Sequence, residues 1–272
     1  VQWQLNKGQD MTGSVIQSDK PVAFTGGNAY ICYKSATSTG GGCDSAHQQI
    51  PPVAALGFEY VAPPYADRGM VPESIFYRIV GTVDGTTLTY DPPVSGAPTT
   101  LSAGQVVDFE TVGAFTVKSQ DENHPFYLGQ TMSGCNVSGG GQLGDEEFVN
   151  ILPPAQFLSK YVFFTDPTYP NTNLVIVRKK MEDGFKDVTV QCHGTVSGWQ
   201  PVDGSGEYEI TWLDLVKGGN GVGNCANGPH QASSDGLFGL MVWGLDTYSS
   251  YAYPAGGSTR PINTVVIKPD PK

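Results

Sequence analysis

The sequence predicts an all-β protein whose antiparallel sheets form sandwich-like lobes, with few helices. Its 272 residues include 35 glycines and 20 prolines, which break helices and punctuate short strands. Aromatic residues make up 11% of the chain and charged residues only 15%, a balance typical of short strands joined by tight turns. A chain of this length can bury a large core by itself, so its size does not require oligomerisation.

A third observation is a unit that returns after about one hundred residues. The paired markers are Pro21 and Pro125, Cys32 and Cys135, Ile50-Pro51-Pro52 and Leu152-Pro153-Pro154, and the aromatic strands around Tyr60 and Tyr161. These markers predict repeats at approximately residues 5–100 and 101–205, with a partial copy at 206–267. Because the copies are incomplete at the end, we expect neighbouring copies to share sheets and residues 1–272 to form one module. A short propeller-like ring is the alternative architecture.

Each unit is predicted to contain a β-hairpin. The first covers residues 76–90 around Asp84-Gly85, and the second covers residues 174–190 around Asp183-Gly184. Asp-Gly between two alternating strands is typical of a primed hairpin turn.

The last part of the chain is predicted to hold two more strands. Residues 237–244, which parallel residues 125–132, indicate a buried strand in which glycine lets another backbone approach. Residues 264–267 predict a final edge strand, and residues 268–272 predict an exit linker toward an adjacent domain of a larger surface protein.

The charge balance excludes some classes of partner. Twenty-six acidic residues against fifteen basic ones give a net charge of -11, which repels a phosphate backbone, so we expect no nucleic acid partner. No apolar run reaches the roughly 18 residues that a membrane-spanning helix needs. We therefore expect no membrane span.

The five cysteines favour structural disulfides. They are Cys32, Cys43, Cys135, Cys192 and Cys225, and none forms the C-x-x-C clusters that zinc and redox sites favour. Disulfides would place the chain in an oxidising compartment, whereas free buried thiols are the alternative.

Several segments resemble a known family in their order and spacing. The segments are residues 12–23, Cys43-Asp44 with residues 49–52, residues 77–80 with Asp84-Gly85-Thr86, residues 151–154 and residues 248–256. Together they resemble the N-terminal domain family of IgGFc-binding protein, a secreted protein of mucus, which also occurs in bacterial surface proteins. The resemblance implies a secreted or cell-surface recognition module without a known catalytic centre. The family has no short Fc-contact motif that maps onto this sequence, so antibody binding is not carried over.

The resemblance also implies a disulfide pattern. It pairs Cys32 with Cys43 and Cys192 with Cys225, which leaves Cys135 without a partner. An odd cysteine in an oxidising compartment is either buried and inert or linked to another chain. We expect Cys135 to be buried.

The sequence offers little sign of catalysis. It has no G-x-S-x-G elbow, and its histidines, His47, His124, His193 and His230, form no H-x-H or H-E-x-x-H pattern. The neighbours Cys192 and His193 would point to opposite faces of a strand. We therefore predict no catalytic residue and no enzyme, with an unrecognised hydrolase as the second alternative.

Acidic pairs suggest calcium as the one candidate cofactor. Asp108 with Glu110 and Glu207 with Glu209 each share a strand face, and Asp145-Glu146-Glu147 follow a glycine loop. Calcium prefers such oxygen ligands, but solvated surface charge is the usual explanation for acidic pairs and the EF-hand spacing is absent. We expect no cofactor.

Tyrosines carry the candidate binding surface. Tyr248, Tyr251 and Tyr253 fall in one short segment, and the last two would share a face of an extended strand. Tyrosine offers a large amphipathic contact area at small entropic cost, although these rings could instead cover the edge of the core. The predicted function is an extracellular adhesion or recognition module that binds a protein or glycan without catalysis. A structural or assembly unit of a surface or matrix protein is the alternative.

Overall fold

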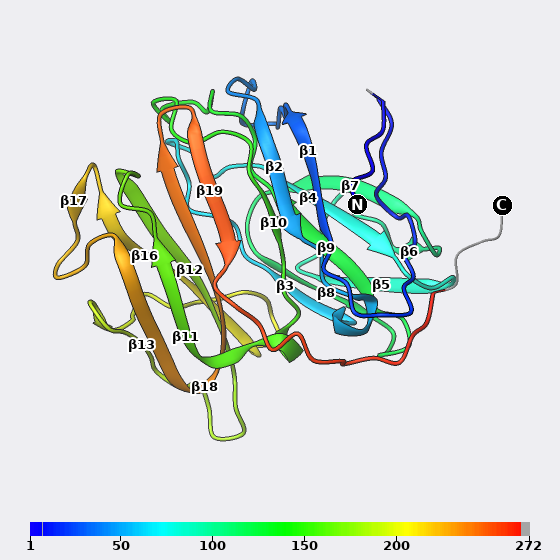
Figure 1. The fold of residues 1–272 in the computed structure, drawn as a ribbon. Coiled ribbons are helices and arrows are strands. Elements are labelled where there is room, and N and C mark those ends of the chain that lie inside the picture. Colours follow the sequence, from blue (N-terminus) through cyan, green and yellow to red (C-terminus); the bar gives the residue numbers. More distant parts are fainter. Residues whose placement is uncertain (7, 268–272) are drawn as a thin grey trace.

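The computed structural model describes residues 1–6 and 8–267 and shows an all-β protein with several antiparallel sheets, as predicted (Figure 1). The predicted exit linker at residues 268–272 lies outside the described residues. Helical structure is limited to two single turns, η1 (Val53–Ala55) and η2 (Pro154–Gln156), in the described part of the chain. Within that same part, no helix is long and apolar enough to cross a membrane.

The first lobe is a sandwich of two four-stranded sheets, with strand orders β10-β9-β4-β7 and β3-β8-β5-β6. Its strands are β3 (Glu59–Ala62), β4 (Ile75–Gly81), β5 (Thr86–Asp91), β6 (Thr100–Leu101), β7 (Val106–Thr111), β8 (Phe115–Ser119), β9 (Phe126–Thr131) and β10 (Phe148–Asn150). Aromatic rings fill the space between the sheets, where Tyr77 on β4 lies 5.0 Å from Phe115 on β8. Inward-facing residues of both sheets therefore form one core.

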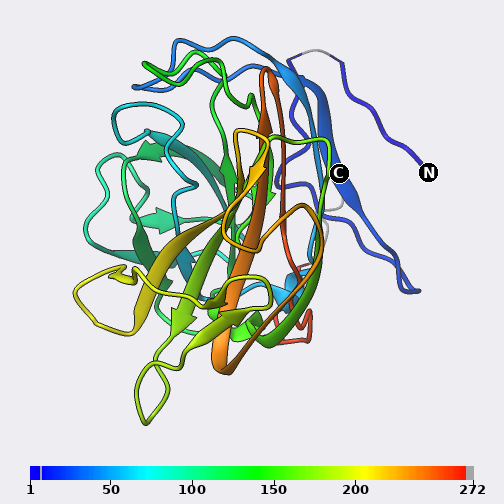
Figure 2. The ribbon, with the colours of Figure 1, turned by 90° about the vertical axis from the view of Figure 1, so that its left-hand side faces the viewer.

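The second lobe is built from one nine-stranded sheet. Its strands are β11 (Leu158–Thr165), β12 (Asn171–Lys179), β13 (Val188–Val190), β14 (Gly194–Thr195), β15 (Gln200–Pro201), β16 (Tyr208–Lys217), β17 (Asn220–Gly221), β18 (Gly228–Asp246) and β19 (Ser249–Pro254). The long strand β18 joins two ladders (Figure 2). Its residues 228–234 lie between β11 and β13, whereas its residues 238–246 lie between β12 and β19.

The two lobes share one pairing scheme. In the first lobe β4 lies between β7 and β9, and β8 lies between β3 and β5. In the second lobe β12 lies between β16 and the second part of β18, and the first part of β18 lies between β11 and β13. The predicted repeat boundaries near residues 100 and 205 fall inside the lobes, so each lobe would combine strands from two units. The repeat boundaries themselves stay a prediction.

A tyrosine hydroxyl makes the same contacts in each lobe. The Tyr60 hydroxyl accepts a hydrogen bond from the Gly57 N–H (3.1 Å) and donates one to the Phe126 carbonyl (2.6 Å). The Tyr161 hydroxyl accepts from the Leu158 N–H (3.1 Å) and donates to the Phe238 carbonyl (2.5 Å). Each ring also packs on the phenylalanine whose carbonyl it binds, with 4.8 Å between ring centroids. Tyr60 thereby joins β3 to β9 of the opposite sheet, whereas Tyr161 joins β11 to its own neighbour β18.

The two predicted hairpins are wrong as pairings. The strand before Asp84-Gly85, β4, pairs with β7 and β9, while the strand after it, β5, pairs with β6 and β8. Likewise β12 pairs with β16 and β18, and β13 pairs with β14 and β18. The Asp-Gly turns reverse the chain as predicted, but they carry it from one ladder to another. Turn chemistry specifies a reversal, whereas distant strands decide the pairing.

Residues 237–244 form a buried part of β18, as predicted, but their glycines accommodate rings and not another backbone, so the predicted role of the glycines is wrong. A Cβ at Gly239 would lie 2.5 Å from the Phe157 ring, and a Cβ at Gly244 would collide with the Tyr251 ring. Gly244 therefore makes room for Tyr251, one of the predicted surface tyrosines.

The predicted final edge strand at residues 264–267 is also wrong, because no strand is assigned in residues 255–267. This segment instead runs along the first lobe after β19 (red in Figure 1) and binds η1. The Ile262 N–H donates to the Ala54 carbonyl (2.7 Å), and the Asn263 amide donates to the Val53 (2.8 Å) and Leu56 (2.9 Å) carbonyls. Hydrogen bonds to the carbonyls of this helical turn and of Leu56 take the place of a β-ladder.

A two-stranded sheet near the N-terminus stands beside the lobes. It consists of β1 (Thr25–Ile31) and β2 (Asp44–Gln49). The antiparallel pairs β1–β2, β9–β10 and β18–β19 each end in a strand, and these last strands, β2, β10 and β19, lie close together. The Gln48 amide on β2 donates to the Ala252 carbonyl of β19 (3.0 Å), and the Asn150 amide on β10 donates to the Gln49 carbonyl (2.8 Å).

The shared tyrosine contact leads to a stability prediction. We expect Tyr60→Phe and Tyr161→Phe each to lower the free energy of unfolding by about 1–3 kcal/mol, because each leaves a buried N–H and carbonyl without partners. Urea denaturation followed by fluorescence measures the effect. The control is Tyr30→Phe, on a ring that is 68% exposed, which should change stability by less than about 0.5 kcal/mol. If Tyr60→Phe is as stable as this control, the assigned role is wrong.

Candidate binding surface

An open aromatic pocket of about 400 Å³ lies on the flank of the second lobe. Phe164 comes from β11, Asp166 and Tyr169 come from the turn between β11 and β12, and Tyr251 and Tyr253 come from β19. β11 and β19 each pair with β18 alone among the named strands, so both are edge strands. The pocket therefore lies between two edges.

The alternation of β19 explains why two of the predicted tyrosines meet here. Ala252 packs into the first core cluster, whereas Tyr251 and Tyr253 on the other face pack against the second. The Tyr251 and Tyr253 ring centroids are 6.3 Å apart, and their planes differ by only 21°. Tyr169 meets Tyr251 edge-on, at 4.7 Å and 83°. The rings form a continuous aromatic wall.

The tyrosine hydroxyls are held by backbone groups of the neighbouring edge. The Asp166 N–H donates to the Tyr251 hydroxyl (2.9 Å). The Phe164 N–H donates to the Tyr253 hydroxyl (3.2 Å), which in turn donates to the Phe164 carbonyl. Phe164 lies opposite Pro229 in the β11–β18 ladder. Because these hydroxyls are already bonded, the rings are fixed in place.

Tyr248 does not belong to this pocket. It occupies the turn between β18 and β19, has a φ of +56°, and is 49% exposed. Its N–H donates to the Gln142 carbonyl (3.0 Å), which ties the turn to the first lobe. The structure therefore brings together Tyr251 and Tyr253 and leaves Tyr248 apart.

Three pocket residues, Phe164, Asp166 and Tyr169, were missed by the sequence reasoning. Phe164 is 54% exposed because it alternates with the buried Phe163 and Thr165 on β11. The adjacent pair of phenylalanines, with one side chain forced outward by the pleat, is the signal that could have found it. Asp166 and Tyr169 carry no such signal, since their positions depend on a turn.

The pocket has one ionised group. The Asp166 Oδ1 atom accepts hydrogen bonds from the N–H (2.8 Å) and the hydroxyl (2.6 Å) of Thr168, and these bonds hold the pKa of Asp166 below its usual value. Burial raises the pKa of Tyr251 to about 12, and it also raises the pKa of Tyr253. At neutral pH the pocket therefore combines neutral rings with one carboxylate.

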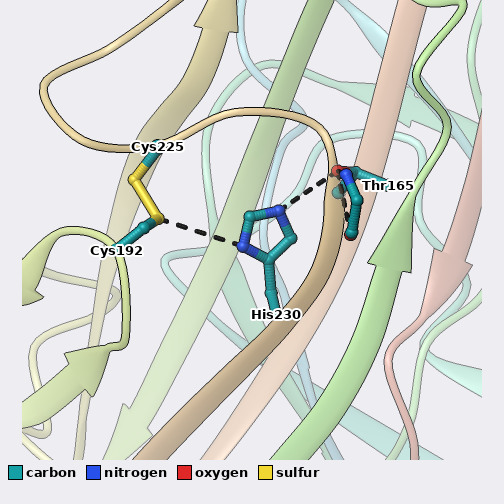
Figure 3. The surroundings of a disulfide bond; sticks show 5 residues. Thr165, Cys192, Cys225 and His230 are labelled. Atoms are coloured by element: carbon teal, nitrogen blue, oxygen red, sulfur yellow. Dashed lines mark hydrogen bonds between the residues drawn. A yellow bond between two sulfur atoms is a disulfide. The ribbon is translucent and has the colours of Figure 1, made fainter.

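A disulfide braces the inner side of the strand that carries Phe164. Cys192, just after β13, is bonded to Cys225, in the loop before β18 (Figure 3). His230 lies between this bridge and β11, with Nδ1 3.9 Å from the Cys192 sulfur and Nε2 3.2 Å from the Thr165 hydroxyl. Its ring also stacks on Phe163, with centroids 5.3 Å apart. Burial lowers the pKa of His230, so the neutral imidazole serves as packing.

The other bridge joins Cys32 and Cys43, so the two bridges join the cysteines that the family resemblance pairs. Cys135 is unpaired and fully buried, and burial raises the pKa of its thiol. The disulfides agree with an oxidising, extracellular compartment.

The four histidines lie on separate elements. His47 is on β2, His124 binds Asp121 in the turn before β9 (2.8 Å), His193 follows β13, and His230 packs on the disulfide. Of these, His124 alone meets a carboxylate in an ion pair within the described part of the chain. The geometry gives the hydrolase alternative no support.

Two of the acidic pairs predicted as calcium candidates engage local partners. Asp108 binds Arg78 (2.7 Å) and Glu209 binds Arg178 (2.5 Å). In residues 1–6 and 8–267, no three His, Cys, Asp or Glu side chains are grouped so that they could hold a metal ion. Calcium binding stays untested by this structure.

The acidic run at residues 145–147 lies at a polar centre of the first lobe. Next to it Arg68 and Glu73 form a fully buried ion pair (2.7 Å), and the Arg68 guanidinium also donates to the Ser133 carbonyl (2.9 Å). Burial raises the pKa of Asp145 to about 6 and that of Glu147 to about 8. Asp44 and Asp145 add to the shift at Glu147 because like charges repel.

Comparisons with known proteins add a family. A family model described as IgGFc binding protein matches residues 1–244. A search of curated proteins finds no match. A solved chain described as an anti-sigma factor domain-containing protein matches at 8% identity and a TM-score of 0.21, covering 84% of this chain and 90% of that chain. A likeness at that TM-score carries no argument.

The raised pKa of Glu147 predicts how stability depends on pH. A carboxyl whose folded pKa lies above its unfolded pKa favours folding at low pH, and that contribution is lost as pH rises from about 4.5 to about 8. We expect Glu147→Gln to be more stable than the parent at pH 8.5 by at least about 1 kcal/mol, with the difference vanishing near pH 4. Urea denaturation of both proteins across this range measures it. A constant difference at every pH would contradict the assignment.

The two disulfides should differ in their contribution to stability. On the chain-entropy account, the stability that a disulfide provides grows with the sequence separation of its cysteines. The double variant Cys192→Ser, Cys225→Ser removes a bridge that spans 33 residues and should lose about 3.7 kcal/mol of unfolding free energy. The double variant Cys32→Ser, Cys43→Ser removes a bridge that spans 11 residues and should lose about 2.8 kcal/mol. Denaturation of the two double variants compares them. A larger loss for the Cys32 and Cys43 pair would show that loop length does not govern the effect.

Proposed function

The chain belongs to the IgGFc-binding protein family, and from this premise we propose that it is an extracellular recognition module that binds a protein partner without catalysing a reaction. The family is one of protein-binding modules. The separate positions of the four histidines support the non-catalytic part of the proposal. The acidic net charge of -11 favours partners with basic surfaces.

The observation that carries the proposal is the aromatic pocket between β11 and β19. Fixed tyrosine rings offer contact area that loses little conformational entropy on binding, and such residues are enriched at interface hot spots. Val162 and Phe164 project from the same edge and are exposed, which extends the apolar surface along β11. An exposed apolar surface with a fixed aromatic wall is typical of a protein-binding site.

A second candidate function, assembly with other copies or domains, is favoured by β1. This strand pairs with β2 alone among the named strands, whereas its counterparts in the lobes, β9 and the second part of β18, pair on both sides. Exposed apolar side chains lie near it, namely Val22 and Tyr30. An open strand edge can pair with another chain. The buried position of Cys135 gives no support to assembly through an interchain disulfide.

Phe164→Ala should weaken partner binding at least tenfold, because it removes a half-exposed ring from the pocket without disturbing the core. The measurement is capture of a protein from the native extracellular fluid by the immobilised full chain, followed by the affinity of the purified partner. Tyr30→Ala, another exposed ring, is the matched control and should leave this affinity unchanged.

Each other outcome has a defined meaning. Loss of self-association in Tyr30→Ala, measured by sedimentation, with no effect of Phe164→Ala would favour assembly over recognition. Retention of a glycan and of no protein would contradict the proposed partner class. Running the capture with calcium present and with a chelator tests the cofactor, and we expect equal retention.

A further inference from the structure

We infer that the pocket between β11 and β19 receives an arginine side chain of the protein partner, with the guanidinium stacked on the tyrosine rings and paired with the Asp166 carboxylate. This inference rests on the proposed function and names the chemistry that the same site recognises. Three features of the pocket support it: its aromatic rings, its one carboxylate and its scarcity of free donors.

The ring faces provide the first feature. Tyr251 and Tyr253 are nearly parallel neighbours, with 6.3 Å between ring centroids and 21° between ring planes, and Phe164 and Tyr169 complete the lining. The face of an aromatic ring carries partial negative charge and attracts a cation held within about 6 Å of its centroid. A planar guanidinium can stack on such a wall, whereas an ammonium acts as a point charge. The same protein already uses this contact, since the Arg178 guanidinium lies 4.1 Å from the Trp199 ring centroid.

The carboxylate provides the second feature. Thr168 makes both of its hydrogen bonds to Asp166 Oδ1, and no hydrogen bond to Oδ2 occurs in the described part of the chain. Likewise no ion pair involves Asp166 among the residues that the structure describes, although other acidic side chains there are paired. The carboxylate is therefore ionised, fixed by its turn, and open on one side. It is the only charged side chain that lines the pocket in the described residues.

The third feature separates a cation from a sugar. A sugar ring needs several donors as well as acceptors, yet the Tyr253 hydroxyl donates to the Phe164 carbonyl and the Tyr169 hydroxyl is bonded to Ser249 (2.9 Å). Only the Tyr251 hydroxyl, which accepts from the Asp166 N–H, keeps a proton without an acceptor among the tyrosines that line the described pocket. The pocket therefore offers mainly π-electron density and carboxylate oxygen, which both attract positive charge. The net charge of -11 adds a long-range attraction for a basic partner.

The test uses two short peptides that differ in charge but hardly in shape. One is acetyl-Gly-Arg-Gly amide, and the other replaces arginine by citrulline, its neutral analogue. Titration into the full chain with ¹³C-labelled tyrosine rings follows the shifts of Tyr251 and Tyr253. We expect the arginine peptide to bind at least tenfold more tightly than the citrulline peptide, with an affinity that falls as salt is added.

Asp166→Asn supplies the matched variant, because an amide oxygen can still accept the two bonds from Thr168. It should bring the arginine peptide to the affinity of the citrulline peptide. Asp203→Asn is the control, since Asp203 makes the same pair of bonds with Ser205 (2.9 and 2.6 Å) and does not line the pocket. Phe164→Leu, which keeps the apolar bulk but removes the aromatic ring, should lower the affinity of the arginine peptide and leave that of the citrulline peptide unchanged.

Equal affinities for the two peptides would overturn the inference, and so would shifts produced by methyl glucoside and not by the arginine peptide. The purified partner separates this inference from the proposed function. If Phe164→Ala abolishes partner binding while Asp166→Asn and excess arginine peptide leave it unchanged, recognition stands and the arginine inference fails. If the arginine peptide binds selectively but no partner protein is retained, the inference stands and the recognition role fails.

Discussion

The whole structure depends on one sheet that has no solvent-facing side at its centre. On β12, Leu174 and Ile176 enter the second core cluster, while the alternating Val175 and Val177 enter the first. A strand buried on both faces reads as a continuous apolar run, and residues 174–177 are such a run. Because both cores require this sheet, the two lobes form a single body and cannot separate without exposing it. The strand β18 reinforces the link, since Met241 and Trp243 enter the first core cluster while Leu240 and Val242 enter the second.

Strand positions followed from the sequence better than strand partners did. Alternation and turn residues locate β4, β5, β12 and β13, because these signals are local. The partners of those strands are distant, and nothing local distinguishes a hairpin from a crossing between ladders, which is why both Asp-Gly hairpins were wrong. The segment at residues 264–267 has the composition of a strand, yet Asn263 and Ile262 bind the carbonyls of η1 instead. Whether this segment forms a strand therefore depends on hydrogen bonds to carbonyls of a turn that is distant in the sequence.

The candidate site shows the same division. The shared face of Tyr251 and Tyr253 is a period-two property and could be predicted, whereas the separation of Tyr248 depends on a turn with positive φ. Phe164 and Asp166 reach the pocket because β11 and β19 lie on the same flank, and that arrangement is set by their common neighbour β18. Sequence alone contains the rings and the carboxylate but not their juxtaposition.

The pocket also solves a structural problem of the fold. Edge strands present unpaired N–H and carbonyl groups, which invite pairing with other chains. Here the Tyr253 hydroxyl binds the N–H and carbonyl of Phe164, and the Tyr251 hydroxyl binds the N–H of Asp166, so side chains of one edge protect the backbone of the other. Protecting the edges fixes the rings, and in the proposed function these fixed rings form the recognition surface. Stability and binding are therefore coupled at Tyr251 and Tyr253 but separable at Phe164 and Asp166, whose side chains take no part in protecting the edges. An open edge without such protection remains at β1, which pairs with β2 alone among the named strands, so the two edges differ in whether side chains cover their backbone groups.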